Sequence, residues 1–432
     1  MTLATLRPFL FYAASIALGK GLSLITLPVM ARALDPAQFV RLDMAASLVE
    51  PVGLFAAFAL GDTLFRHARG TPEDLRVALG RLLGLGLAVA SLLVLLTQFA
   101  LLPLVQAWPN MPGETALRLV LLAACLGGMI ELPLAYMRLG GHAGLFLTVV
   151  AARSLMQAGL MVGLLLSGWG IDAVLIANAS VDIAIVAVLL LTLPKGTRPA
   201  LALGHFRPLL RYAGPILLGG FAMFALGACD RWFLAGKVAA QDLAHYALAA
   251  KLALALALLT QPFALWWYPR RLGVLAGPDG IARTMRFWMI GLALVGLGAV
   301  LVMLGARLLI LGFMPEAYHG ALRYLPALLA IAALNELSSL SNGVAYARAD
   351  GWRVLTTNLS GASVALLFYL LLIPPFGVTG AIVATLLGQV VRLGLFLADR
   401  HGEARLPYPL LRAGLFASVC IGLVGSLGWG AA

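Results

Sequence analysis

Six ionisable residues lie near the middle of long apolar segments, where charged groups are rare. They are Lys20, Glu50, Arg153, Asp182, Lys251 and Glu336. Placing such a side chain at mid-bilayer costs roughly 2.5–3.5 kcal/mol, so it usually faces a partner or water. We therefore expect these six side chains to face partners or an aqueous cavity rather than lipid.

Polar residues accompany these charges at helical spacing. They are Gln157, Asn178, Asn335, Ser339 and Asn342. Gln157 and Asn178 lie one turn from a charged residue, and the other three form an i, i+4, i+7 stripe beside Glu336. Such stripes line aqueous cavities, but the same residue types also hydrogen bond between membrane helices. We expect the cations to face a cavity, and both interpretations stay open for the asparagine and serine residues.

The composition requires these residues to lie in a membrane. Of 432 residues, 62% are hydrophobic and 11% are charged, whereas a soluble domain has roughly 25% charged residues. Apolar runs of about 20 residues recur, each long enough to cross the bilayer as a helix. In lipid a segment must satisfy its own backbone hydrogen bonds. The sequence thus predicts an all-α, polytopic membrane helix bundle.

Several function classes find no support in the sequence. The formal net charge of +12 does not indicate nucleic-acid binding, because the basic residues lie between the apolar segments. Cys125, Cys229 and Cys420 are isolated and lack the spacing of a metal site or redox pair. We find no GxxxxGK[ST] phosphate loop and no His–Asp or paired-carboxylate cluster. We therefore expect no enzyme activity, no metal and no cofactor other than a coupling H⁺ or Na⁺.

Thirteen apolar segments are predicted to cross the membrane. They cover residues 9–31, 42–64, 77–104, 115–137, 144–167, 171–193, 210–234, 244–266, 287–311, 321–345, 353–373, 377–398 and 410–430. Loops after the even-numbered segments hold most basic residues, whereas the opposite loops hold few. The positive-inside rule then places the N-terminus in the cytoplasm. With thirteen crossings the C-terminus would lie outside.

Other charges lie near segment ends and are weaker candidates. Those near the outer ends are Asp43, Arg118, Asp230 and Arg231, and those near the inner ends are Asp62, Arg66, Arg81 and Arg392. Long side chains at such positions can extend to the membrane interface. We expect this group to anchor the helices, with Asp230, Arg231 and Arg66 as alternative gating residues.

An internal repeat divides the chain. The stretch Arg7–Ala13 returns as Arg207–Ala213, and Ile16, Leu18 and Gly19 continue the match at the same offset of 200 residues. With about six spans per copy the copies share one orientation, as parallel repeats do in some transporters. We expect two six-helix lobes around a central cavity and one additional C-terminal helix. Their boundaries are 1–200, 201–400 and 401–432.

Short motifs then occur in a familiar order. Ala31–Pro36 reads Ala-Arg-Ala-Leu-Asp-Pro, Tyr212–Pro215 is a Tyr-x-x-Pro motif, Asp230 precedes Arg231, and Trp266–Pro269 is a Trp-x-x-Pro motif. This pattern resembles the Wzx-type polysaccharide and O-antigen flippases of the MATE-like MOP exporter superfamily. Two departures are Val40, where a glycine is common in that family, and the odd number of spans.

The resemblance implies a fold, a substrate and a location. The fold would be two six-helix lobes in a V around a central cavity. The substrate would be an undecaprenyl-pyrophosphate-linked oligosaccharide, flipped from the cytoplasmic to the periplasmic leaflet by ion-coupled alternating access. For such a substrate we expect Lys20, Arg153 and Lys251 to bind the phosphates in place of lost water. Glu50, Asp182 and Glu336 would be the candidates for ion coupling, because a desolvated carboxylate has a raised proton affinity. The protein would be a monomer in the bacterial inner membrane, working beside polysaccharide polymerase machinery. The alternatives are a MATE-type drug or cation antiporter, a lipid II flippase, and a membrane-embedded polymerase or transferase of the cell envelope.

Overall fold

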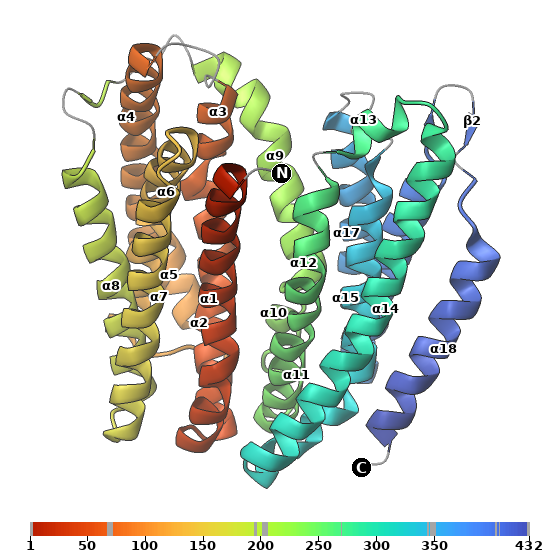
Figure 1. Ribbon diagram of the computed structural model, residues 1–432. Coiled ribbons are helices and arrows are strands. Elements are labelled where there is room, and N and C mark those ends of the chain that lie inside the picture. The colour runs from red at the N-terminus through yellow and green to blue at the C-terminus, as the bar shows by residue number, and fades with distance from the viewer. Residues whose placement is uncertain are drawn as a thin grey trace. The chain divides into compact units, whose positions relative to one another are not determined.

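The computed structural model describes residues 3–66, 72–193, 197–200, 206–268, 270–343, 345, 351–401, 404–405 and 407–429. Its regular structure is helical apart from one short antiparallel pair, β1 (Arg400–His401) and β2 (Ala404–Arg405), so the predicted all-α class is confirmed (Figure 1). The chain divides into two compact units, Met1–Phe221 and Ala222–Ala432, whose boundary lies within one helix. The lobes expected at 1–200, 201–400 and 401–432 stay a prediction.

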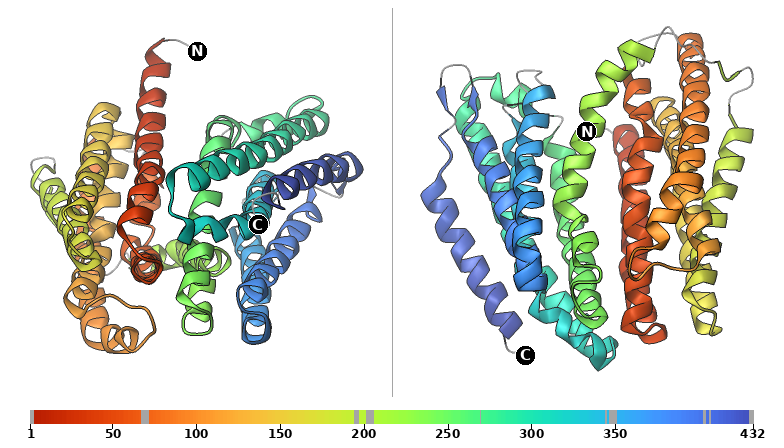
Figure 2. Two further views of the ribbon diagram at one scale, coloured as in Figure 1. Left: turned by 90° about the horizontal axis from the view of Figure 1, so that it is seen from below. Right: turned by 180° about the vertical axis from the view of Figure 1, so that it is seen from behind.

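Helix α6 is the centre of unit 1. The elements of this unit are α1 (Leu3–Ala33), α2 (Pro36–Ala57), α3 (Leu60–Arg66), α4 (Pro72–Leu96), the π-helical η1 (Thr97–Leu101), α5 (Leu102–Gln106), α6 (Glu114–Leu139), α7 (Ala143–Leu166), α8 (Ile171–Leu191) and most of α9 (Phe206–Gly227). Helix α6 packs against α2, α3, α4 and α8, while α1 packs along α7 (Figure 2). Apolar residues such as Leu60, Leu79 and Met129 fill the space between these helices.

Helix α15 has the same central place in unit 2. The elements of this unit are the end of α9, α10 (Asp230–Leu234), α11 (Ala240–Ala253), α12 (Ala255–Trp267), α13 (Arg271–Leu275), α14 (Gly280–Phe313), the 3₁₀ segment η3 (Glu316–Arg323), α15 (Leu325–Ser341), α17 (Gly351–Leu397) and α18 (Leu410–Trp429). Helix α15 packs against α11, α12, α14 and α17, and α18 covers α14 (Figure 1). The order of packed helices is thus alike in the two units, as a repeat predicts, although superposition of the copies stays a prediction.

The described helices are long and apolar enough for a multi-pass membrane protein. Seven continuous helical stretches qualify as spans, among them Glu73–Gln106, which joins α4, η1 and α5, and Ala240–Trp267, which joins α11 and α12. The bent pair η3 and α15 is an eighth if it is counted as one span. Each of the thirteen predicted segments overlaps at least one helix. Helix α17 covers two predicted segments: Gly377 breaks it with φ 54°, and Gly361 packs against the backbone of Gly388, so its halves lie side by side. The count of thirteen crossings stays a prediction.

The second predicted span, 42–64, is interrupted rather than continuous. Its helix α2 begins at Pro36, where the N-cap residue Asp35 and Gln38, the third residue of the helix, form a reciprocal capping box. It ends where Phe58 and Ala59 take φ values of 42° and 50°, a left-handed conformation that costs energy in residues other than glycine. Gly128 of α6 lies directly against the backbone at this break. The close approach of α6 therefore supports the interruption between α2 and α3.

Candidate functional site

A polar cavity of about 140 Å³ lies inside unit 2. Residues of α9, α10, α11, α12, α15 and α17 line it. Its polar lining consists of Asp230, Tyr246, Asn335, Glu336, Thr385 and Gln389. Apolar side chains such as Leu254 and Ile331 complete the wall. This combination of a mostly apolar wall with a few convergent polar groups is typical of binding sites for small organic groups.

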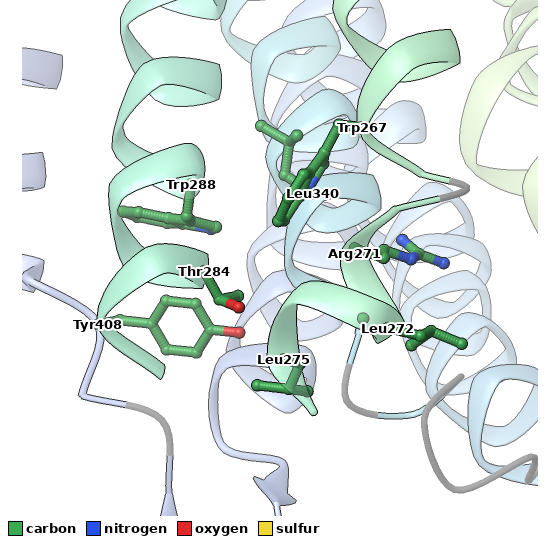
Figure 3. A pocket seen from close by; sticks show the side chains of 9 residues that line it. Trp267, Arg271, Leu272, Leu275, Thr284, Trp288, Leu340 and Tyr408 are labelled. Carbon is green, nitrogen blue, oxygen red and sulfur yellow. The ribbon is translucent and has the colours of Figure 1, made fainter. Parts of the chain in front are cut away.

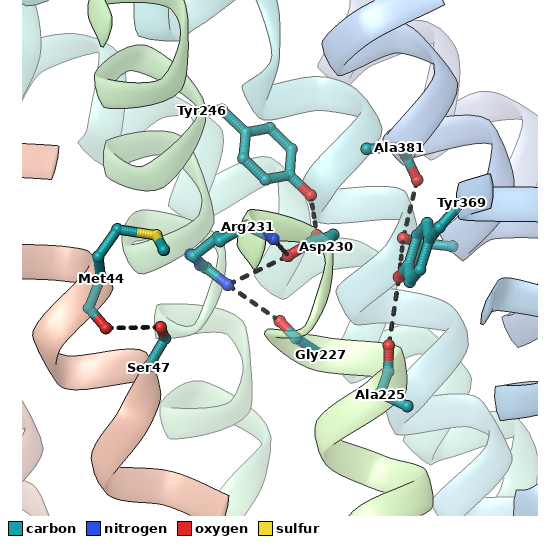
Figure 4. Close-up of polar contacts among 10 residues, drawn as sticks. Met44, Ser47, Ala225, Gly227, Asp230, Arg231, Tyr246, Tyr369 and Ala381 are labelled. Atoms are coloured by element: carbon teal, nitrogen blue, oxygen red, sulfur yellow. Dashed lines mark hydrogen bonds and ion pairs between the residues drawn. The ribbon is translucent and has the colours of Figure 1, made fainter. Parts of the chain in front are cut away.

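Asp230 and Arg231 enter this site because the helix breaks just before them. Helix α9 ends at Gly227, and α10 begins at Asp230. Asp230 Oδ1 accepts hydrogen bonds from the backbone N–H of Arg231 at 2.7 Å and from its guanidinium at 3.5 Å, while Tyr246 donates its hydroxyl to Oδ2 (Figure 4). The two residues are only 3% and 7% exposed. The expectation that they reach the membrane interface is therefore wrong, since both side chains are buried and pair with each other within the protein.

A second tyrosine, Tyr369, forms hydrogen bonds next to the wall of the cavity. The hydroxyl of Tyr369, in the first half of α17, lies 2.8 Å from Thr385 Oγ1 in the second half and donates to the carbonyl of Ala225 at 3.3 Å (Figure 4). Thr385 donates in turn to the carbonyl of Ala381. These bonds tie α9 to both halves of α17. They hold Thr385 at the cavity.

Arg392 is the centre of a hydrogen-bond network that includes the cavity residues Asn335 and Gln389. Its Nε donates to Asn358 Oδ1 at 2.8 Å, and its Nη1 donates to Asn335 Oδ1 at 2.8 Å and to Gln389 Oε1 at 3.3 Å. Arg392 is 3% exposed. The expected anchoring of Arg392 at the inner interface is therefore wrong, because three side-chain amides bind it inside unit 2. Glu336, the residue next to Asn335, accepts a hydrogen bond through Oε2 from Thr260 at 2.8 Å.

Arg271 contacts the end of the polar stripe on α15. Arg271 donates to Asn342 Oδ1 at 2.6 Å and to the carbonyl of Ser339 at 3.5 Å, and its guanidinium lies 4.9 Å from the centre of the Tyr268 ring. Arg271 also borders a small cavity of about 20 Å³ beside Trp288 and Tyr408 (Figure 3). Burial raises the pKa of Tyr408 to about 12. The phenol therefore stays neutral at physiological pH.

A separate ion pair lies in unit 1. Arg153 of α7 donates through Nε to Asp182 Oδ1 of α8 at 2.6 Å, and Gln157 donates to the same oxygen at 2.8 Å. The Arg153 and Asp182 side chains are 36% and 20% exposed. Asn178 Oδ1, one turn away, is buried and has no hydrogen-bond partner among the described residues. The predicted one-turn pairing of Gln157 with Arg153 thus becomes a three-residue cluster around one carboxylate.

Comparison with known proteins identifies the family. The family model described as polysaccharide biosynthesis protein matches residues 29–269. The chain belongs to this family. A comparison with curated proteins found no match. The resemblance to polysaccharide flippases that the sequence motifs suggested is thereby confirmed.

Solved transporter structures share the fold of this polysaccharide biosynthesis protein. The lipid II flippase MurJ in an inward closed conformation has a TM-score of 0.67 at 11% identity, covering 97% of this chain and 98% of that one. The MATE multidrug transporter DinF-BH has a TM-score of 0.62 at 14% identity, covering 91% and 94%. A MOP superfamily transporter from Pyrococcus furiosus has a TM-score of 0.50 at 14% identity, covering 94% and 96%. The protein is thus a multi-pass membrane protein with the MOP transporter fold.

Four predicted site residues remain: Lys20, Arg66, Glu50 and Lys251. The side chains of Lys20 and Arg66 lie outside the described residues, although the backbone of Lys20 belongs to α1, where neighbouring Gly19 faces Ser154 beside Arg153. Glu50 is exposed on α2. Lys251 is half-buried on α11. It is not one of the residues that line the cavity of unit 2, although the preceding residue, Ala250, is. The roles predicted for these residues stay predictions.

The sequence analysis missed one polar face of this family member. Thr385, Gln389 and Arg392 stand at i, i+4 and i+7 in the second half of α17, the same spacing as the stripe on α15. That spacing was a usable signal. Arg392 is instead predicted to lie at the membrane interface, because it is close to the end of its apolar segment. Tyr369 gave no comparable signal, because it is isolated in an apolar run, and Asn358 was not singled out among its polar neighbours Thr356, Thr357 and Ser360.

Proposed function

We propose that this protein flips an undecaprenyl-pyrophosphate-linked oligosaccharide from the cytoplasmic to the periplasmic leaflet of the bacterial inner membrane. Its membership of the polysaccharide biosynthesis family carries this proposal. The MOP transporter fold and the short connections between helices support transport rather than synthesis of the glycan. Partly exposed polar groups in unit 1 and buried ones in unit 2 support this proposal, because a polar head group needs such partners at membrane depth.

The physical task is to move a pyrophosphate and sugars through hydrocarbon while the polyprenyl tail stays in lipid. Each phosphate loses water and needs cations or N–H donors in its place. Arg153 is the described cation best suited to this role, because its side chain is 36% exposed and its fork of donors can bind phosphate bidentately. Lys20 is the second candidate, and the position of its neighbour Gly19, which faces the side chain of Ser154 next to Arg153, supports this choice. Lys251 is the third.

The partner of Arg153 supports a proposal for ion coupling. Asp182 holds the guanidinium at 2.6 Å, so an incoming phosphate competes with this carboxylate. Protonation of Asp182 removes the competing charge and releases Arg153 to the phosphate. Asp182 is therefore our first choice for the group that binds the coupling H⁺, ahead of Glu50 and Glu336. The N-terminus would face the cytoplasm, and the protein would act as a monomer beside the polymerase machinery.

A flipping assay tests the proposed function. Purified protein is reconstituted into liposomes that contain a fluorescent polyprenyl-pyrophosphate-linked oligosaccharide, and the fraction that becomes accessible to a membrane-impermeant reagent is followed. We expect protein-dependent flipping of this lipid and no transport of a cationic dye such as rhodamine. Dye transport without flipping would favour the drug antiporter and overturn the proposal. Deletion of the gene should in parallel leave the lipid-linked glycan in the cytoplasmic leaflet.

A further inference from the structure

The orientation of two amides determines what the cavity of unit 2 can bind. Asn335 and Gln389 both line the cavity and both accept a hydrogen bond from Arg392. A guanidinium has donors only, so it must face the amide oxygens. Each amide therefore turns its NH₂ group away from Arg392. Among the described residues, neither NH₂ group donates a hydrogen bond.

The cavity consequently presents donors and an acceptor side by side. Asn335 and Gln389 supply N–H donors, and the carboxylate of Glu336, the residue next to Asn335, supplies an acceptor. A bare cation fits this wall poorly, because it would meet two NH₂ groups backed by the buried charge of Arg392. A purely anionic group would meet the carboxylate of Glu336. A neutral group with neighbouring hydroxyls matches both kinds of partner, since each hydroxyl donates one hydrogen bond and accepts two.

The size and the remaining wall agree with such a ligand. At 10–15 Å³ for each water, a cavity of about 140 Å³ holds roughly ten waters. That is the scale of one sugar ring rather than of an oligosaccharide. The apolar side chains of Met223, Leu254 and Ile331 offer contact to the C–H face of a ring. Asp230, which also lines the cavity, pairs with Arg231 at 3.5 Å and accepts a hydrogen bond from Tyr246.

We propose that this cavity is a subsite for a single sugar residue of the transported glycan. The inference rests on the proposed function, because the sugar would arrive on the lipid-linked substrate. Arg392 is a positioning residue in this scheme: it fixes the two amides and does not touch the sugar. The phosphates would be bound elsewhere, by the cations considered above.

Isosteric substitutions separate the subsite from the framework. Asn335→Asp and Gln389→Glu keep the oxygen that faces Arg392 but replace the NH₂ donor with an acceptor. Asn358→Asp is the matched control, because Asn358 also accepts from Arg392 at 2.8 Å yet does not line the cavity. All three variants place a new carboxylate against the same guanidinium. Only the first two change the wall that the sugar would meet.

The reconstituted variants are assayed with two lipids, the polyprenyl-pyrophosphate-linked oligosaccharide and polyprenyl pyrophosphate without sugar. We expect Asn335→Asp and Gln389→Glu to slow flipping of the glycosylated lipid about tenfold, the effect of roughly one lost and one unpaired hydrogen bond. Flipping of the sugar-free lipid should be unchanged in both, and Asn358→Asp should behave as wild type with both lipids. Equal loss with the two lipids, or no loss with either, would overturn the subsite.

A binding measurement keeps the test independent of the proposed function. Detergent-solubilised wild-type protein is titrated calorimetrically with free hexoses, N-acetylhexosamines and NaCl. We expect millimolar binding of at least one sugar, lost in Asn335→Asp and retained in Asn358→Asp. Sugar binding without any flipping of lipid-linked glycan would disprove the proposed function but keep a sugar site that takes free sugars. Binding of Na⁺ alone, strengthened by Asn335→Asp, would show a cation site and refute the sugar subsite.

Discussion

Arg153 and Asp182 form a direct ion pair between neighbouring helices, with 2.6 Å between Nε and Oδ1. The cation predicted to bind phosphate is therefore already bound to the carboxylate predicted to take part in coupling. Gln157 donates to the same carboxylate oxygen, so three polar side chains share one contact point. Both partners are partly exposed, which leaves the pair open to competition by a ligand.

Replacing Arg153 should separate transport from stability. Arg153→Ala leaves the carboxylate of Asp182 without its cation, and we expect a loss of about 1–3 kcal/mol together with lower abundance in the membrane. The double variant Arg153→Ala with Asp182→Asn removes the unpaired charge and should restore abundance. Export of the glycan should stay at least about tenfold reduced in both. Immunoblots of membranes and surface glycan staining measure the two effects, and normal export by Arg153→Ala would eliminate this residue as a phosphate ligand.

Asp182→Asn should uncouple flipping from the proton gradient. The amide keeps a hydrogen bond to Arg153 but cannot exchange a proton, so Arg153 is permanently available to phosphate. In proteoliposomes with an imposed pH difference we expect wild type to respond to the gradient, whereas Asp182→Asn should flip at one rate with and without it. Glu336→Gln serves as the comparison, because Glu336 is assigned to the sugar subsite. If Glu336→Gln and not Asp182→Asn removes the response, the coupling group lies in unit 2.

Gly128 should tolerate no side chain, whereas its neighbour should. A Cβ at Gly128 would overlap the carbonyl oxygen of Ala56, and Ala57 also lies close by, so backbone must move where the chain breaks between α2 and α3. We expect Gly128→Ala to cost about 1–3 kcal/mol or more. Gly127 meets no atom within 4 Å, so Gly127→Ala should be neutral or stabilising. Thermal unfolding of the two variants in detergent measures this difference, and equal melting temperatures would mean that the helices are not packed this closely.

The orientation of the chain can be measured directly. A reporter inserted within residues 66–71 should be active only as a cytoplasmic fusion, and one inserted near Asn110 only as a periplasmic fusion. The excess of basic residues in loops after even-numbered segments is the physical reason, since such loops are retained on the inside. Asn110 lies in a turn between α5 and α6 with φ 61°, so an insertion there leaves both helices intact. A periplasmic signal from the first site would reverse the whole topology.

Most of the fold was predictable from the sequence, because lipid restricts the choice. An apolar run in hydrocarbon must satisfy its own backbone, so each such run became helix, from α1 to α18. The one-turn spacing of Gln157 from Arg153 placed both on one face, where they share Asp182. The position of Glu336 in the middle of an apolar segment singled it out, and the same periodicity placed Asn335 in a polar stripe beside it, with a cavity and interhelical hydrogen bonding both left open; both residues line the cavity of unit 2. These are local properties, and they depend only on which residues follow one another along a helix.

Tertiary structure decided what those faces meet. Position along the chain suggested that Asp230, Arg231 and Arg392 reach the interface, but the distance of a residue from the end of its segment does not reveal what surrounds it. The break before Asp230 brings its carboxylate to Tyr246, and the fold of α17 on itself brings Arg392 to Asn358. A buried charge is stable only where partners satisfy it, and some of these partners, such as Tyr246 for Asp230 and Asn358 for Arg392, are distant in sequence. The sequence therefore specified helices and polar faces, whereas packing alone determined which charges are paired and which amides face a cavity.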